Sequence, residues 1–159
     1  MKFSKISYPF LMAVSFAMLN AFALLLSSCG GGSNDLALTA GDKAVVNLVA
    51  GPWKVVSVTV DGVDKTSLFT GFTITFTKSS ANTGGYSTAN GGAVWPATGQ
   101  WTIGDMNTAG SFLRSDGLEV LLTEITDTSL KMSLAWTKNT FGPGRIESIS
   151  GQHVFVVGK

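Results

Sequence analysis

The chain has 159 residues, with 11 Lys and Arg against 10 Asp and Glu, one His and one Cys. This near-balance of charge argues against a nucleic-acid partner, because such binding requires a basic face that displaces counterions from phosphates. A single Cys cannot form a disulfide within the chain, so the fold has to depend on buried apolar surface.

The first 28 residues have the layout of an export signal. Lys2 and Lys5 precede an apolar run over residues 10–26, and small residues follow it. The alternatives are an uncleaved transmembrane helix, for which about 20 apolar residues are needed, and an ordinary secretory signal with an incidental Cys. Asn20 within the run argues against the first alternative, and the position of the sole Cys directly after the small residues argues against the second.

Leu26-Ser27-Ser28-Cys29 resembles the lipobox of bacterial lipoproteins. In that family the Cys thiol receives a diacylglyceryl group and the signal is cut before the Cys. The resemblance implies lipidation of Cys29, a membrane partner reached through the lipid anchor, and a location in the cell envelope, with the outer membrane as the first expectation. It leaves open whether the domain faces the periplasm or the cell surface.

The part of the chain after the signal reads as a tether and one domain. Removal of Lys2 and Lys5 from the 11 basic residues leaves 9 against 10 acidic residues. Residues 29–38 begin with Cys29 and three glycines and predict a flexible tether. Residues 39–159 have a length that suits a single hydrophobic core.

The elements of the domain follow one another at hairpin spacing. A short helix is predicted over residues 39–50, where Thr39 can act as the N-cap and Asp42 stands three residues later. The clearest strand is residues 71–77, in which Phe72, Ile74 and Phe76 alternate with threonines. The other predicted strands are residues 53–60, a short stretch around Tyr86, and residues 95–103, 111–114, 118–126, 129–137 and 145–157.

This order predicts an all-β fold, a small up-and-down antiparallel barrel of about eight strands behind one helix. A sandwich with Greek-key connections is the alternative. Closure is favoured because it removes exposed strand edges. The inward-facing stripe consists of Phe72, Ile74, Phe76, Trp101, Leu130, Met132, Leu134 and Trp136. These side chains either line a small cavity or pack as a core, since eight strands enclose a space that side chains just fill or that holds one small ligand.

Gly51-Pro52-Trp53, behind the helix at the start of the first strand, is similar to the signature of lipocalin-like families. The order of later segments, including Trp101-Thr102 and the closing run over residues 151–156, resembles small lipocalin-like lipoproteins of Gram-negative envelopes. The resemblance implies that Trp53 closes one end of the barrel and that Arg145 packs over it. It also implies a small apolar or amphipathic ligand as the partner.

The residues offer little for catalysis. His153 is the sole His and lies in an apolar strand, so a zinc site and a Ser-His-Asp site are not expected, nor is a cofactor. Glu119, Glu124 and Glu147 fit an outward polar face better than a catalytic pair. Two non-enzymatic functions remain as predictions. One is binding of a small apolar ligand, and the other is a filled barrel that meets a protein, as an inhibitor or an envelope assembly module.

Overall fold

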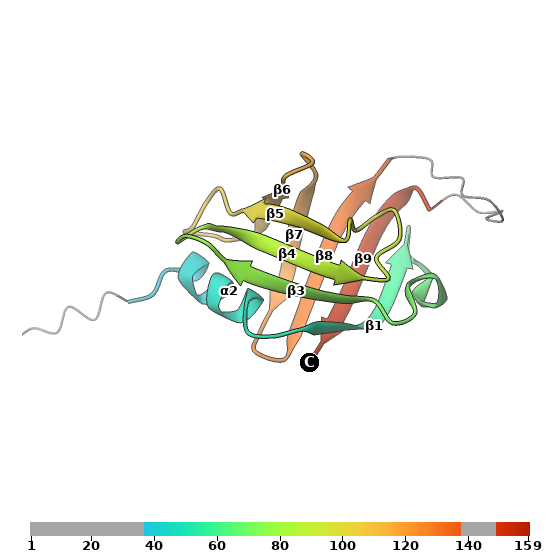
Figure 1. The fold of residues 1–159 in the computed structure, drawn as a ribbon, viewed down its shortest axis with the longest axis horizontal. Helices are drawn as coiled ribbons and strands as arrows, with labels where there is room; N and C mark the ends of the chain where they lie inside the picture. The colour runs from blue at the N-terminus through green and yellow to red at the C-terminus, as the bar shows by residue number, and fades with distance from the viewer. Residues whose placement is uncertain (1–36, 138–148) are drawn as a thin grey trace, which may run out of the picture. The chain divides into compact units, whose positions relative to one another are not determined.

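The structure is a computed structural model that describes residues 37–137 and 149–159. Figure 1 shows the helix and strands of this part of the chain. The elements are α2 (Ala40–Leu48), β1 (Trp53–Val60), β2 (Val63–Asp64), the 3-10 turn η1 (Thr66–Phe69), β3 (Thr73–Lys78), β4 (Thr83–Ala89), β5 (Thr98–Thr102), β6 (Ser111–Arg114), β7 (Glu119–Ile125), β8 (Ser129–Trp136) and β9 (Gly151–Gly158). No helix among these residues is both long and apolar enough to cross a bilayer.

The sheet closes into an antiparallel barrel. Strands from β3 to β9 pair in chain order, and β1 pairs with both β3 and β9, so that eight strands form the wall and the two-residue β2 is appended to β1. The join between β1 and β9 is long, running from Lys54 opposite Gly158 to Val60 opposite His153. The join between β1 and β3 consists of Trp53 opposite Ile74 and Lys54 opposite Thr73. The predicted eight-stranded up-and-down barrel is therefore confirmed, and a sandwich is excluded.

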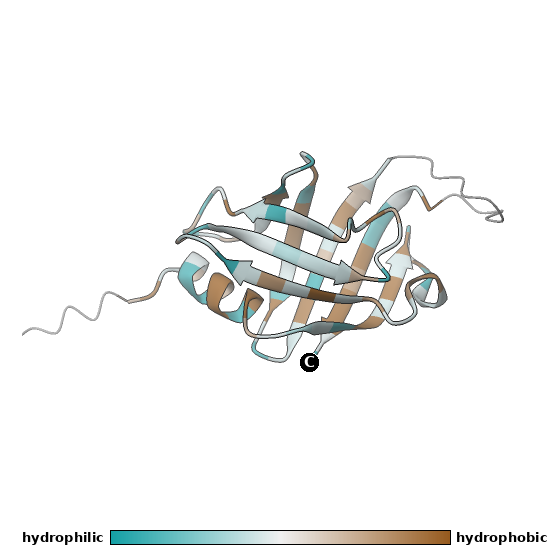
Figure 2. Ribbon diagram, in the orientation of Figure 1, coloured by the Kyte–Doolittle hydropathy of each residue, from teal (hydrophilic) through white to brown (hydrophobic). Residues whose placement is uncertain are grey.

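Strand alternation places the core inside this barrel. In β3 the side chains of Ile74 and Phe76 are buried, while Thr73 and Thr75 are half-buried on the outer face. The same alternation holds in β9, where His153, Phe155 and Val157 point inward. Figure 2 shows the resulting mixture of apolar and polar bands along the strands. One side of each strand thus faces the core and the other faces solvent.

Helix α2 packs at one end of the barrel, which we call the helix end. The Thr39 hydroxyl accepts from the Asp42 N–H, and the Asp42 carboxylate accepts from the Thr39 N–H, which completes a capping box. The Thr39 hydroxyl also donates to the Asp42 carboxylate at 2.7 Å, and this bond, with the one from the Thr39 N–H, holds the pKa of Asp42 below its usual value. Ala44, Val45 and Leu48 form the buried face. A helix of nine residues is marginal alone, so this docking stabilises it.

The opposite end of the barrel contains the β2–η1 segment and the connections β4–β5 and β6–β7. The β4–β5 connection differs from the strand predicted over residues 95–103, because β5 covers only Thr98–Thr102. Asn90 and Gly92 adopt positive φ, and the Trp95 N–H donates to the Gly91 carbonyl. Pro96 then has no N–H for a ladder. The connection therefore folds as a tight loop that brings Trp95 over the barrel.

Candidate functional site

The barrel interior is packed with side chains. The eight residues predicted to line it all belong to one buried core: Phe72, Ile74, Phe76, Trp101, Leu130, Met132, Leu134 and Trp136. Rings from separate parts of the wall meet across the interior. Phe76 of β3 contacts Phe112 of β6, with centroids 5.7 Å apart, and Phe155 of β9 contacts Trp95 at 6.0 Å. Aromatic rings at such separations leave no room for a ligand between them.

Trp95 closes the end opposite α2. Its side chain is 1% exposed. It meets Tyr86 edge-on at 5.6 Å and lies 6.2 Å from Phe72. In a ligand-binding cup this end would be the mouth, but here the β4–β5 loop covers it. We call Trp95 and its neighbour Val94 the plug.

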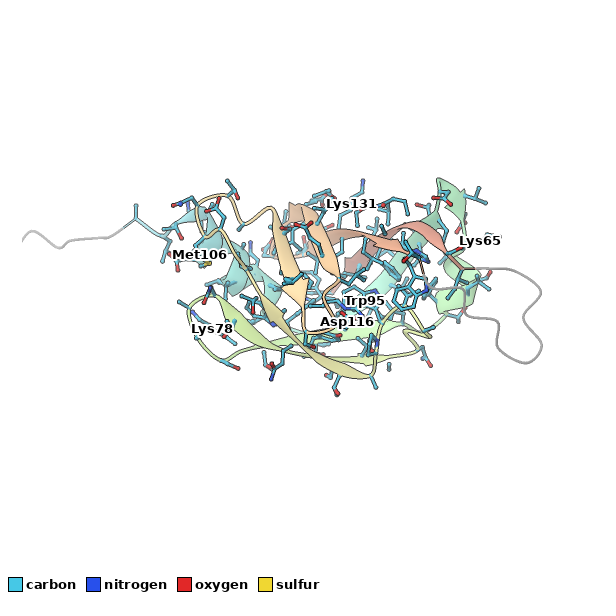
Figure 3. All side chains as sticks on the ribbon, turned by 90° about the horizontal axis from the view of Figure 1, so that it is seen from above. Lys65, Lys78, Trp95, Met106, Asp116 and Lys131 are labelled. Atoms are coloured by element: carbon cyan, nitrogen blue, oxygen red, sulfur yellow. The ribbon has the colours of Figure 1, made fainter. Side chains whose placement is uncertain are left out.

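Arg114 fixes the plug in place. The guanidinium is fully buried, and its Cζ lies 4.8 Å from the centre of the Trp95 ring. One nitrogen donates to the Val94 carbonyl at 2.8 Å, and two others hold the Asp116 carboxylate at 2.7 and 3.2 Å. Figure 3 labels Trp95 and Asp116 close to one another. A bidentate pair of this kind is directional, so Arg114 ties the β4–β5 loop to the β6–β7 turn.

The role of Arg114 was missed from the sequence, although a signal existed. Alternation over residues 111–114 places Phe112 and Arg114 on one face and Leu113 on the other. An Arg that shares a face with Phe in so short a strand is a candidate for a buried cation. Its charge acts on Tyr86 as well: burial raises the pKa of the Tyr86 phenol, and Arg114 offsets part of that rise.

His153 is a buried, neutral part of the core. Its Nδ1 lies 3.1 Å from the Gly151 carbonyl, and its ring stacks on Phe155 at an interplanar angle of 12°. Burial lowers the pKa of His153, against a smaller opposing effect of the hydrogen bond to Gly151. Because the Gly151 carbonyl can only accept a hydrogen bond, Nδ1 carries the proton of the neutral ring. Nε2 has no hydrogen-bond partner among the described residues.

Trp53 lies at the helix end. It is fully buried, and its Nε1 donates to the Leu48 carbonyl at 2.9 Å, at the last turn of α2. The cation over its ring is Lys159, whose Nζ lies 5.1 Å from the ring centre. Arg145, predicted for that position, lies outside the described residues, as does Cys29.

The outer wall carries an exposed apolar feature. Leu113 of β6 is 52% exposed and Leu121 of β7 is 43% exposed. Leu113 lies opposite Glu119 and Leu121 lies opposite Ser111, so the two leucines are diagonal neighbours on the outer face, and we call them the leucine ridge. Beside it runs a shallow groove of about 210 Å³ over β7, β8 and β9, lined partly by the small residues Ser133 and Ala135. The outer face of the barrel thus has two protruding leucines next to a shallow groove.

Comparison with protein families, with curated proteins and with solved structures finds no match. Within the described residues, no three His, Cys, Asp or Glu side chains group as metal ligands.

Proposed function

We propose that this chain is a lipid-anchored envelope protein whose barrel acts through its outer surface, by contacting a protein partner. The observation that carries the proposal is the filled interior, in which Phe76, Phe112, Phe155 and Trp95 meet across the lumen. A barrel of this kind presents its chemistry outside. We place the contact at the leucine ridge, where two exposed apolar side chains flank the polar pair Ser111–Glu119 and so offer both apolar and polar contacts to a partner.

The anchor part of the proposal is supported by the sequence. Cys29 stands directly after an apolar signal in a lipobox-like context. One acyl chain holds a protein only marginally, whereas two or more hold it stably. Metabolic labelling with palmitate tests the anchor: the wild-type chain should be labelled and should fractionate with the outer membrane, and Cys29→Ala should lose both properties. Unchanged labelling of Cys29→Ala would contradict the anchor.

The surface part of the proposal is tested by a photo-crosslinking amino acid at Leu121 in living cells. A matched control carries the same amino acid at Thr98, which is exposed on β5. The position on the ridge should give a discrete protein adduct that Leu113→Lys abolishes, and the control position should give none. Equal adducts at both positions, or an adduct unaffected by Leu113→Lys, would contradict a partner on the ridge.

An apolar fluorescent probe distinguishes this proposal from small-ligand binding. Titration of the folded chain with 1-N-phenylnaphthylamine should show no saturable uptake, because the described side chains fill the barrel. Saturable uptake at one probe per chain, weakened by substitution of Phe72 or Trp136, would reject the filled-barrel proposal in favour of a ligand cup.

A further inference from the structure

The outer face of β3, β4 and β5 carries a shallow trough of about 310 Å³, which we call the glycine trough. Pairing places Thr77, Gly85 and Gln100 in one row across the three strands, so that Gly85 is the low point between two side chains. Thr83 and Thr102 form the next row. The lining has no charged side chain; it consists of hydroxyls, one amide and backbone, with the Trp101 ring beneath.

Gly84 and Gly85 have different reasons to be glycine. A Cβ on Gly84 would collide with the Thr77 carbonyl and the Trp101 ring, so the fold requires glycine there. A Cβ on Gly85 would meet Thr77 Oγ1 at 3.2 Å and the Gly99 carbonyl at 3.6 Å, and its φ is an ordinary one. A side chain at Gly85 therefore requires the Thr77 hydroxyl, which donates to the Gly85 carbonyl at 3.3 Å, to move by a few tenths of an ångström, a much smaller shift than Gly84 would require.

Glycine inside a strand weakens it and commonly marks a bulge or the close approach of a ligand or another backbone. The registers of β4 with β3 and with β5 run through Gly85 without a shift, so no bulge is present. β4 is paired on both sides, which excludes an added strand. Gly85 leaves an open depression on the outer face, in which a ligand from outside can approach the backbone closely.

The chemistry of the trough specifies the ligand. No charge is present to bind a phosphate or a carboxylate, and the exposed side chains are too polar to hold a lipid tail. Hydroxyls donate and accept hydrogen bonds, and an amide does both through separate atoms. The Trp101 indole donates to the Gly85 carbonyl at 2.9 Å from the interior side of the sheet, where its ring is buried, so the floor of the trough is glycine backbone. Hydroxyls and an amide beside such a floor match the hydroxyl rim of a neutral sugar ring.

We propose that the glycine trough binds a neutral saccharide, with the sugar ring seated over Gly85 and hydrogen-bonded to Thr77 and Gln100. The volume is at the low end for small-molecule sites, which span about 300–1,000 Å³. The affinity of so shallow a site for one sugar is low, and it rises when a glycan offers the same sugar many times along its length. This site lies on strands other than those of the leucine ridge, and it goes beyond the partner proposed above.

Saturation-transfer NMR on the full chain in detergent tests the proposal, with neutral di- and trisaccharides of glucose, galactose, mannose and N-acetylglucosamine as probes. At least one probe should receive saturation from the wild-type protein. Gly85→Val fills the trough with a residue that strands favour and should abolish the signal. Ser87→Val, on the same outer face of β4 but outside the trough, is the matched control and should keep it.

Two further measurements keep the result interpretable. Melting temperatures of both valine variants should lie within about 2 °C of wild type, as for other surface substitutions. Gln100→Ala leaves the backbone unchanged and should weaken binding about tenfold, the effect of one or two lost hydrogen bonds. Absence of signal from every probe with the wild-type chain, or a signal that survives both Gly85→Val and Gln100→Ala, would overturn the proposal. Neither result would alter crosslinking at the leucine ridge, so the two proposals fail separately.

Discussion

Replacement of Trp53 by Ala is the most direct test of how the helix end is held. Loss of a fully buried large aromatic costs about 3–5 kcal/mol, and Trp53 is fully buried. The same change leaves the Leu48 carbonyl without the indole donor at 2.9 Å, which adds about 1 kcal/mol. The sum, about 4–6 kcal/mol, approaches the whole stability of a small domain, about 5–15 kcal/mol.

Thermal and urea unfolding of the full chain, both followed by far-ultraviolet circular dichroism, measure this loss. For a domain of this size each kcal/mol corresponds to about 3–5 °C in melting temperature. Trp53→Ala should therefore either melt lower than wild type by roughly 10 °C or more, or not fold. Trp53→Phe keeps most of the ring and removes the donor, and should cost clearly less. A melting temperature for Trp53→Ala close to wild type would refute the burial argument, and equal losses for the two variants would assign the effect to the hydrogen bond alone.

Three other predictions follow from the same contacts. Asp116→Ala should destabilise the domain by about 3–5 kcal/mol, because it leaves the buried Arg114 guanidinium without its carboxylate partner. Arg114→Met should cost less, because the Asp116 side chain that it leaves unpaired is 32% exposed. The reverse order of the two losses in urea unfolding would mean that the guanidinium can reach water. Burial lowers the pKa of His153 in the folded state, so the folded protein keeps this ring neutral where the unfolded chain would protonate it. The free energy of unfolding is therefore highest above about pH 6.5, the pKa in the unfolded chain, and falls as the pH drops below that value. The free energy of unfolding should therefore fall more steeply with decreasing pH in wild type than in His153→Phe, and parallel curves would contradict this. Thr39→Ala removes the N-cap acceptor of α2 and should cost about 1 kcal/mol, whereas Thr39→Ser should cost little; equal melting temperatures for all three proteins would show that docking alone holds the helix.

Pattern and turn chemistry were sufficient for the architecture. The alternation through Ile74 and Phe76 specified β3, and the capping residue Thr39 specified the start of α2. Asp61 and Gly62, both with positive φ, form the turn after β1, as an Asp-Gly pair favours. These features are local, so the sequence determines them before any tertiary contact forms.

The occupant of the lumen could not be predicted in the same way. Trp95 falls within the strand predicted over residues 95–103, yet it folds inward from a loop. The reason is a long-range contact, the guanidinium of Arg114 over its ring. Whether a barrel is a cup or a filled core depends on one connection of this kind, and periodicity carries no information about it.

The short join between β1 and β3 has a consequence for how the barrel comes apart. Two residue pairs connect these strands, whereas the register of β8 with β9 runs over eight residues, from Ser129 to Trp136. Partial opening begins where few contacts must break, so amide hydrogens of β1 and β3 at this join should exchange before those of β8 and β9. Trp53 is one of the paired residues and also the anchor of α2. Undocking of the helix and parting of the barrel wall are therefore one event, and a ligand or partner that held α2 in place would also slow the opening of the whole sheet.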